Sequence, residues 1–436
     1  MVNLRWQAQQ RGSEGGTPAF PEASANALAC IPAASHRHAA VRVSAAAERR
    51  IRQGSPWVFA DSIQHLSHAA GPGDLAVVFD HGRRFLAIGL YDPHSPIRVL
   101  ILQRGQGATI DREWFRLRVA DAARLRKPLQ RTKTTGYRLV HGENDGMPGL
   151  VVDRYDRTLV IKLYTAAWVP HLPSVISALR EAFAAERLVL RLGRAAARQK
   201  QYLYGLSDGM PLVGPPLAGP LVFLENGLRF EVDPVHGQKT GFFLDQRENR
   251  ARVEKLASGK IALNVFAYTG AFSVYAARGG ARSILSVDSS APALEAAERN
   301  FALNQGIAAV ASARHNVLVL DAFEALARLA REGRSFDLAI VDPPSFAKER
   351  DELERALAAY ARLTKLTLAV LRPGGILVMA SCSSRVSAEV FFSSVNQAAS
   401  QAGRVLRELE RTGHALDHPV AFPEGEYLKC LFAVAE

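Results

Sequence analysis

From Ile261 to the C-terminus, short apolar runs alternate regularly with longer amphipathic segments. The apolar runs predict buried strands at 261–266, 282–287, 313–318, 336–341, 375–380 and 428–434. The segments between them predict helices near 271–278, 291–304, 322–332, 352–370 and 387–402. This alternation of strand and helix predicts an α/β domain with a doubly wound, mostly parallel sheet.

Two smaller units are expected before this domain. Closely spaced strands and turns over 40–108 predict a small β-barrel, and 109–204 has the mixed pattern of an α+β middle domain. Gly and Pro are frequent over 205–222, which we interpret as a linker to a final domain at 223–436. Residues 1–39 are rich in Ala, Ser, Gly and Pro without a period, and this composition predicts a disordered tail.

The charge of the chain favours a polyanionic partner. Lys and Arg number 54 against 42 Asp and Glu, which gives a formal net charge of +12. A helix predicted at 111–125 and the run after it to Lys133 are rich in basic residues, so we expect RNA phosphate contacts there. Two plainer interpretations stay open: an Arg-favouring genome, and a helix face that is merely solvated.

Composition also bounds the setting in which the protein works. No apolar run is long enough to span a bilayer, and no signal peptide is recognisable, so we expect no membrane association. Cys30, Cys382 and Cys430 lie far apart and match neither a disulfide framework nor a zinc site. We therefore expect a cytoplasmic protein without a bound metal. The oligomeric state stays open, and a homodimer is compatible with the sequence.

A carboxylate follows the buried strand at 336–341. Asp342 stands at the end of this strand, and Pro343 and Pro344 then turn the chain away from the sheet. Ligands of open parallel sheets bind at the carboxyl ends of strands. Asp342 and a proline carbonyl could bond the edge of a flat polar ring while Phe346 stacks on its face. The alternative is a surface turn in which Asp342 caps a helix.

The turn after the first strand of this domain suggests a nucleoside ligand without phosphates. Gly270 is the one glycine between Asn264 and Phe272, whereas a pyrophosphate needs a glycine-rich loop. S-adenosylmethionine fits this restriction. Asp288 ends the second strand, where an acidic residue binds ribose hydroxyls. Asp321 follows the third strand and would accept from the adenine amino group or cap the next helix.

A cysteine is predicted close to Asp342. Cys382 follows the strand at 375–380, which places it at the same sheet edge as Asp342 and one strand along. A lone cysteine is usually a small buried hydrophobe, and this interpretation suits Cys430, inside the last apolar run. The position of Cys382 favours a chemical role instead.

Several of these motifs together resemble the bacterial 23S rRNA (cytosine-5)-methyltransferase I family. They are Gly-Gln-Lys-Thr-Gly-Phe-Phe-Leu-Asp-Gln-Arg (237–247), Asn-Val-Phe-Ala-Tyr-Thr-Gly (264–270), Val-Asp-Pro-Pro-Ser-Phe (341–346), Ser-Cys-Ser (381–383) and Pro-Glu-Gly-Glu-Tyr-Leu-Lys (423–429). The resemblance extends from about Val41 to the C-terminus. Many RNA 5-methylcytosine enzymes carry a second cysteine near Pro344, and its absence here matches the single-cysteine variant of this family.

The resemblance implies a fold, a reaction and a set of residues. The expected fold is a PUA-like RNA-binding β-barrel, an α+β middle domain and a Rossmann-like class I methyltransferase domain. The expected reaction forms 5-methylcytosine in 23S rRNA, with Cys382 and Asp342 catalytic and Pro343, Pro344 and Phe346 at the substrate. The residues expected at S-adenosylmethionine are Lys239, Thr240, Gly241, Phe242, Asp245, Arg247, Asn264, Phe266, Tyr268, Thr269, Gly270, Asp288, Ser289, Asp321, Ala322 and Asp342.

Two other functions remain open from the sequence. Asp-Pro-Pro-Ser-Phe is similar to the motif of enzymes that methylate a nitrogen of adenine or guanine, and in that chemistry Cys382 would be dispensable. The chain could also be an RNA-binding or ribosome-assembly factor that keeps the fold without catalysis. The presence of Asp288, Asp342 and Cys382 together argues against this last interpretation.

Overall fold

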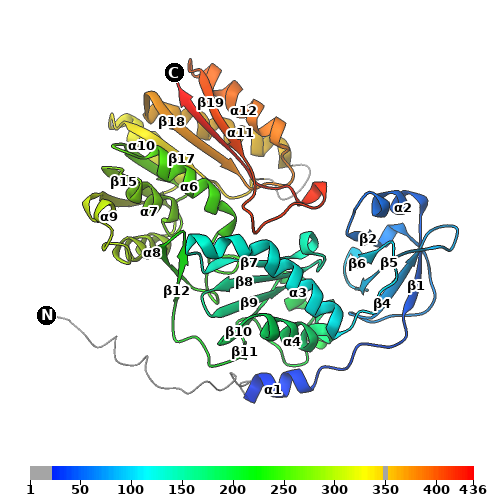
Figure 1. Cartoon of the computed structure of the whole chain (residues 1–436). Coiled ribbons are helices and arrows are strands. Elements are labelled where there is room, and N and C mark those ends of the chain that lie inside the picture. Colours follow the sequence, from blue (N-terminus) through cyan, green and yellow to red (C-terminus); the bar gives the residue numbers. More distant parts are fainter. Residues whose placement is uncertain (1–21, 347–351) are drawn as a thin grey trace.

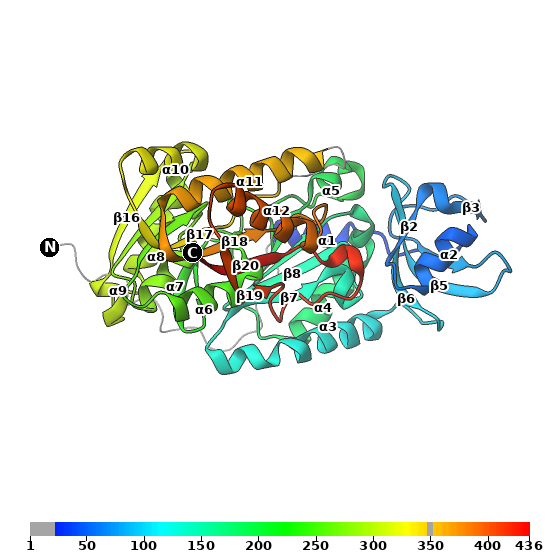
Figure 2. The same cartoon turned by 90° about the horizontal axis from the view of Figure 1, so that it is seen from above.

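The computed structural model describes residues 22–346 and 352–436, which form three consecutive units (Figure 1). The N-terminal unit lies at one end of the molecule in both views (Figures 1 and 2). Residues 1–21 of the predicted disordered tail lie outside the described residues. The prediction of disorder is wrong for 22–29, which form helix α1 (Glu22–Ala29). This helix is ordered because Ala27 packs into the core of the middle unit and the Ser24 hydroxyl donates to the Pro211 carbonyl.

The N-terminal unit is a six-stranded sheet with the strand order β2-β6-β5-β4-β1-β3. Its edge strands β2 and β3 are separated by only three residues, so the sheet must curl until its two edges lie near each other. This geometry agrees with the predicted barrel. The elements are β1 (Ala39–Val43), α2 (Ala45–Arg52), β2 (Trp57–Phe59), β3 (Ile63–Leu66), β4 (Leu75–Phe79), β5 (Phe85–Tyr91) and β6 (Ile97–Arg104).

The middle unit is a five-stranded sheet with the order β11-β10-β9-β8-β7, and two helices contribute to its apolar core. Its elements are α3 (Arg112–Arg126), β7 (Gly136–His141), β8 (Leu150–Tyr155), β9 (Thr158–Leu163), α4 (Leu172–Ala182), β10 (Arg187–Leu192), α5 (Arg194–Arg198) and β11 (Pro211–Val213). Strand β11 corrects the predicted linker at 205–222. It belongs to this sheet because Leu188 and Val213 pair in an antiparallel ladder.

The C-terminal unit contains a seven-stranded sheet with the order β16-β15-β14-β17-β18-β20-β19, in which β20 runs in the direction opposite to the other strands. Its strands are β14 (Ile261–Val265), β15 (Ser283–Asp288), β16 (Arg314–Val319), β17 (Phe336–Val341), β18 (Leu371–Ser381), β19 (Leu406–Thr412) and β20 (Lys429–Ala435). Its helices are α6 (Arg247–Leu256), α7 (Ala271–Arg278), α8 (Ala291–Ala302), α9 (Ala308–Ser312), α10 (Ala322–Arg331), α11 (Leu353–Val370) and α12 (Ala388–Gln401). The hairpin β12 (Leu221–Glu225) and β13 (Leu228–Val232) precedes it.

Alternate residues of the central strands fill two separate cores. Leu338 and Ile340 of β17 pack on the face covered by α6 and α7, whereas Ala339 and Val341 pack on the face covered by α10, α11 and α12. Both faces are therefore buried, as expected for a parallel sheet whose strands read as continuous apolar runs. This leaves the carboxyl edge of the sheet for ligands.

Polar contacts fix the three units to one another. His171 donates from Nε2 to the Gly73 carbonyl across 2.8 Å, which joins the middle unit to the N-terminal one. Arg126 of α3 donates to the Asp417 carbonyl across 2.9 Å, which joins the middle unit to the C-terminal one. Over the described residues, no helix is both long and apolar enough to cross a membrane.

Candidate active site

Asp342 and Cys382 come together at the carboxyl edge of the central sheet. Strands β17 and β18 are parallel neighbours with Val341 opposite Met379, so the two residues follow the ends of adjacent strands. The Cys382 thiol donates to the Pro343 carbonyl, with 3.8 Å between Sγ and the oxygen. Asp342 and Cys382 thus lie at the same edge of the sheet, one strand apart, as the sequence predicts.

Burial disfavours the charged form of both groups. It raises the pKa of Asp342 to about 7, with a further contribution from the nearby Asp245 carboxylate. Burial and then the Asp342 carboxylate raise the pKa of Cys382 to about 11. Lys239 opposes both shifts through its positive charge. Both shifts favour the neutral forms of the thiol and the carboxyl group, and the raised pKa of Asp342 lies near neutral pH.

A chain of three hydrogen bonds orients the Asp342 side chain. Gln246 donates from Nε2 to Asp342 Oδ1 across 2.8 Å, and Asn249 donates to Gln246 Oε1 across 2.6 Å. The Thr412 hydroxyl donates to Asn249 Oδ1, also across 2.6 Å. Because each amide is fixed by the next, the Gln246 amino group must face Asp342. Sequence reasoning missed these residues, although Gln246 and Asn249 lie three positions apart, on one face of a helical segment.

The loop before α6 brings a cation and a second carboxylate to the same edge. Lys239 forms an ion pair with Asp245, with 3.1 Å between Nζ and Oδ2. The Tyr427 hydroxyl donates to the same oxygen across 2.9 Å. Asp245 Oδ1 is buried without a hydrogen-bond partner, which is costly for a carboxylate and marks a position for a donor that is not part of the described chain.

Three of the residues predicted at the cofactor, two in this loop and one at the start of α6, have side chains that contact other parts of the protein. The Thr240 hydroxyl donates to Asp153 of the middle unit, and the Phe242 ring packs against Phe223 in the core. Arg247 is buried and forms a 2.8 Å ion pair with Asp417. Their groups are satisfied by the protein itself, so these residues hold the loop in place. At Gly241 a Cβ would lie 2.6 Å from the Asp233 carbonyl, so glycine is required there for packing.

The turn from β14 to α7 is strained. Phe266, Tyr268 and Gly270 have φ values of 61°, 47° and 73°, and such values are unusual for aromatic residues. Gly270 also lies against α8, where a Cβ would be 2.6 Å from that of Ala297. Thr269 is buried in the same turn. Backbone strain of this kind clusters at ligand-binding sites.

Two side chains beside this turn have free or adaptable acceptor oxygens. Asn264 is fully buried and donates to Ser273, but its Oδ1 has no partner. Asp288 ends β15 as predicted, and its two oxygens accept from Tyr268 N and Ser290 N across 2.8 and 2.9 Å. Each carboxylate oxygen can accept a second bond. Ser289 beside it is exposed.

The remaining predicted residues divide between structural and open positions. Asp321 caps α10, since its Oδ1 accepts from Phe323 N and Glu324 N, and its neighbour Ala322 is buried. Both of these bonds use one oxygen, so the cap does not occupy the other. The motif that follows Asp342 places Pro343 in the interior and Pro344 at the surface.

Phe346 lies half-buried beside other aromatic rings. Its centroid is 5.2 Å from that of Tyr360 and 6.5 Å from that of Phe323. Tyr360 in turn shares a 2.8 Å hydrogen bond with Ser381, the residue before Cys382. Phe346 therefore packs against aromatic rings of the protein, and its role in substrate stacking stays a prediction.

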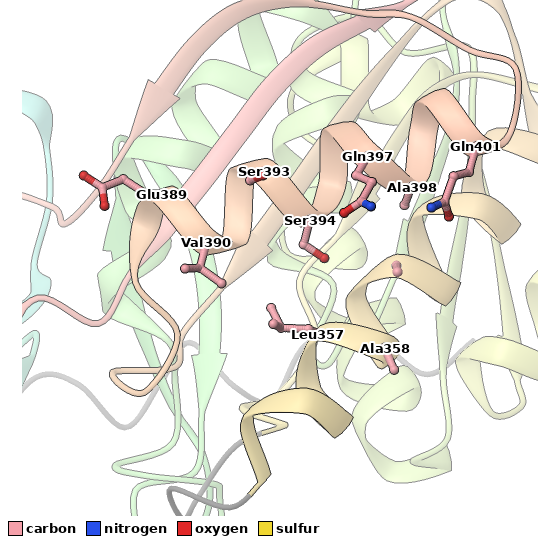
Figure 3. Close-up of a pocket in the computed structure, with 10 residues that line it drawn as sticks. Leu357, Ala358, Glu389, Val390, Ser393, Ser394, Gln397, Ala398 and Gln401 are labelled. Carbon is pink, nitrogen blue, oxygen red and sulfur yellow. The ribbon is translucent and has the colours of Figure 1, made fainter.

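A surface groove between α11 and α12 lies away from these residues (Figure 3). Its lining includes Leu357, Ala358, Ser393, Ser394 and Gln397, most of them small or polar. None of the predicted site residues lines it. Among the described residues, no group of three or more His, Cys, Asp and Glu side chains is arranged to hold a metal ion.

Two protein-family models match the chain. An S-adenosylmethionine-dependent methyltransferase model matches residues 137–432, and a PUA-like domain model matches residues 41–104. The first covers the middle and C-terminal units together, and the second covers the curled N-terminal sheet. The predicted PUA-like and methyltransferase folds are therefore confirmed.

Curated proteins of similar sequence span nearly the whole chain. A ribosomal RNA large subunit methyltransferase of Deinococcus radiodurans is 49% identical over 411 residues, which cover 92% of this chain and 98% of that protein. A ribosomal RNA large subunit methyltransferase I of Shewanella amazonensis is 37% identical, covering 90% of this chain and 98% of that protein. A solved S-adenosylmethionine-dependent methyltransferase from Streptococcus mutans superposes with a TM-score of 0.76 at 21% identity, covering 91% and 99% of the two chains. This last likeness supports the fold.

Proposed function

Because the chain belongs to the family of ribosomal RNA large-subunit methyltransferases, we propose that it methylates C5 of a cytosine in 23S rRNA through a covalent adduct with Cys382. The observation that carries this proposal is the Cys382 thiol at the carboxyl edge of the sheet, hydrogen-bonded to the carbonyl that follows Asp342. A nucleophile beside an acid–base group is the pair that this reaction needs. The proposed place of action is the cytoplasm, where this RNA is made and used.

The residues at the sheet edge fit S-adenosylmethionine. The unpartnered oxygens of Asn264 and Asp245 suit the ammonium group of its amino-acid part, and Asp288 suits the ribose hydroxyls. Lys239, Tyr268 and Gly270 line the loops around these positions. When bound, the cofactor supplies an electrophilic methyl group on a positively charged sulfur.

Cysteine chemistry is required because C5 of cytosine is too weak a nucleophile on its own. In the proposed first step the Asp342 carboxylate takes the thiol proton and the Cys382 sulfur forms a bond to C6. The electron pair of the C5–C6 double bond moves toward C5, and Asp342 returns its proton to the ring at N3. A carboxyl group with a pKa near 7 can accept and release a proton in this way.

The adduct is resolved by elimination after C5 has been methylated. The C5 proton leaves to water, its electron pair restores the double bond, and the S–C6 pair returns to Cys382 sulfur. N3 then gives up the proton that it received. The target base must leave any stacked helix to reach Cys382, because the thiol is largely buried at the sheet edge.

The proposed partner is RNA, which the curled N-terminal sheet and the basic segment after α3 would hold mainly through phosphates. In α3 itself, Arg112, Arg116 and Arg124 form ion pairs with Glu181, Glu113 and Asp121. This pairing favours the interpretation of that helix as a solvated face. Lys127, Arg131 and Lys133 after it are exposed and have no ion pair within the described chain.

Trapping with 5-azacytosine tests the proposed adduct. RNA with this base at the target has nitrogen at position 5, so no proton can leave and the wild-type protein should form a denaturant-stable complex. Cys382→Ala should abolish trapping and turnover while cofactor affinity is kept. Cys382→Ser should be nearly as inactive, because a hydroxyl is far less acidic than a thiol. Cys430→Ala is the matched control, since Cys430 is buried in β20.

The identity of the methylated nucleoside distinguishes between the competing functions. Mass spectrometry of nucleosides from methylated RNA should show 5-methylcytosine. Normal turnover by Cys382→Ala with a methylated adenine or guanine would replace the proposal by nitrogen methylation at the Asp-Pro-Pro-Ser-Phe motif. RNA binding with no methyl transfer by the wild-type protein would leave the assembly-factor interpretation.

A further inference from the structure

Lys429 is a buried lysine directly behind the Cys382 loop. It begins β20 and lies opposite Ser381, the last residue of β18, in the antiparallel register. Cys382 follows Ser381 directly. Only 4% of its surface is exposed. It belongs to the Pro-Glu-Gly-Glu-Tyr-Leu-Lys motif, to which the proposed reaction assigns no role.

The contacts of Lys429 are unusual for a buried ammonium group. Its Nζ donates to the carbonyl oxygens of Ser383 and Val386, both in the loop from Cys382 to α12. Both of these partners are uncharged; among the described residues no carboxylate is within ion-pair distance of Nζ, although the charge of Glu426 raises the pKa of Lys429. Burying an unpaired charge is costly, so a neutral residue of similar length would be more stable here unless the charge had a use.

Tyr427, two residues earlier, reaches the opposite loop of the site through its bond to Asp245. In extended chain, residues two apart point to the same side. The C-terminal segment therefore holds the loop of Asp245 with one side chain and the loop of Cys382 with the next. This arrangement explains the spacing of Tyr427 and Lys429 in the motif.

Cys382 needs positive charge nearby. Burial and Asp342 hold its pKa near 11, and Asp245 adds to this shift. Burial lowers the pKa of Lys429 to about 8. The Cys382 thiolate acts in the opposite direction and raises this pKa, because the two charges attract each other. The titratable groups that face Cys382 are Asp342, Lys239, Asp245, Tyr360, Tyr427 and Lys429, and those that face Lys429 are Cys382, Glu426 and His414.

We propose that Lys429 is a positioning residue for Cys382: it fixes the loop of residues 383–386 and supplies positive charge that stabilises the Cys382 thiolate. Its importance for catalysis rests on the proposed function, but its effect on the thiol does not. No bond to Lys429 forms or breaks. It acts by holding the sulfur in place and by raising the thiolate fraction at a given pH.

Alkylation by iodoacetamide measures this effect without any methyl transfer. The full-length protein carries Cys30→Ser to remove the exposed thiol, and peptide mass spectrometry follows Cys382 as a function of pH. In Lys429→Met, alkylation below about pH 8, where Lys429 of the wild type is charged, should be about tenfold slower, and the two pH–rate curves should meet at higher pH, where Lys429 is neutral. Lys429→Arg keeps the charge and should restore most of the rate. Lys365→Met, on the exposed face of α11, is the matched control.

The outcome separates a role for the charge from a role in stability alone. A lower melting temperature with an unchanged pH–rate curve in Lys429→Met would overturn the proposal, and so would an equal loss in Lys429→Arg. If Lys429→Met does not fold, Lys429→Gln keeps a donor without the charge and should show the same slower alkylation below about pH 8. Because the assay needs no RNA, it succeeds or fails independently of the base that is methylated.

Discussion

At the scale of single residues, the site contains two groups, Asp342 and Cys382, whose pKa values are both raised by burial. Asp342 has a pKa near 7 and Cys382 a pKa near 11, both raised first by burial. The two residues follow adjacent strands, and the Cys382 thiol donates to the carbonyl of Pro343, the residue after Asp342. A cationic, exposed environment would favour the thiolate, whereas burial and the nearby Asp342 favour the protonated thiol of Cys382.

The first prediction concerns the pH dependence of methyl transfer. Asp342 must be deprotonated to accept the thiol proton, and its raised pKa means that this form is lost as pH falls through about 7. The rate should therefore rise with pH across that value. Asp342→Asn should lower kcat by roughly 10²–10⁴-fold and remove this limb of the profile. A profile of the same shape in Asp342→Asn would exclude Asp342 as the proton acceptor.

Asp288 gives a prediction about cofactor affinity. Its oxygens already hold the backbone of Tyr268 and Ser290, and they are expected to accept from the ribose as well. Asp288→Ala should weaken S-adenosylmethionine binding by about 1.5–3 kcal/mol, as for a hydrogen bond to a charged group. Glu295→Ala, on the exposed face of α8, serves as the control in calorimetry. Equal affinities in the two variants would remove Asp288 from the cofactor site.

At the scale of elements, pairing between side chains decides which basic residues remain available to RNA. Arg116 in α3 forms an ion pair with Glu113 across 2.6 Å, and the pKa of Arg116 is raised by this hydrogen bond. Lys127 and Arg131, one and five residues after the same helix, are exposed and lack such partners in the described chain. Proximity in the sequence therefore does not imply an equal contribution to phosphate binding.

This difference predicts two classes of salt dependence. Lys127→Ala and Arg131→Ala should each lower the slope of log K against log salt for RNA binding by about 0.7–0.9, because each releases one counterion fewer. Arg116→Ala should leave the slope nearly unchanged, since its charge is already offset by Glu113. Fluorescence anisotropy titrations at several salt concentrations measure these slopes. A full loss of slope in Arg116→Ala would mean that RNA breaks the ion pair.

At the scale of the whole molecule, Asp417 joins the middle and C-terminal units. Its carboxylate is fully buried and accepts from Arg247 and from the Arg138 backbone, while its carbonyl accepts from Arg126. Burial alone would raise its pKa, but His418 and Arg247 lower it well below the usual value. The two units that the methyltransferase family model covers thus share one buried polar network.

Removing this carboxylate should destabilise both units together. Asp417→Ala leaves the Arg247 charge buried without its partner and should cost about 3–5 kcal/mol in urea unfolding. Asp121→Ala, which breaks an exposed pair with Arg124, should cost about 0.5 kcal/mol. The stability that Asp417 provides is present above its unfolded-state pKa of about 3.9 and is lost as pH falls below it toward the lowered folded value. Separate unfolding transitions for the two units in wild type would contradict this coupling.

Local sequence was sufficient for elements that carry their own pattern. The apolar run ending at Val341 and the following Asp-Pro-Pro predict a buried strand and its end, and the same holds for the strand before Cys382. Their proximity then follows, because parallel strands present their carboxyl ends at one edge. Strand β19 was missed, since its residues are mostly exposed and charged, and α1 was missed because its order depends on a contact with Pro211.

Local sequence patterns therefore predict the central sheet, its carboxyl edge and the two groups, Asp342 and Cys382, that stand there. The neighbours that shift the pKa values and fix the orientation of these groups are known only from the folded chain. Gln246 contacts Asp342 from 96 positions away, and Thr412 contacts Asn249 from 163 positions away. Lys429 contacts the loop after Cys382 from 46 and 43 positions away. Contacts of the same kind join Thr240 to Asp153 of the middle unit and Arg247 to Asp417 within the C-terminal unit. Such partners have no local pattern, because burial and charge at a site are sums over whatever segments the fold brings next to it.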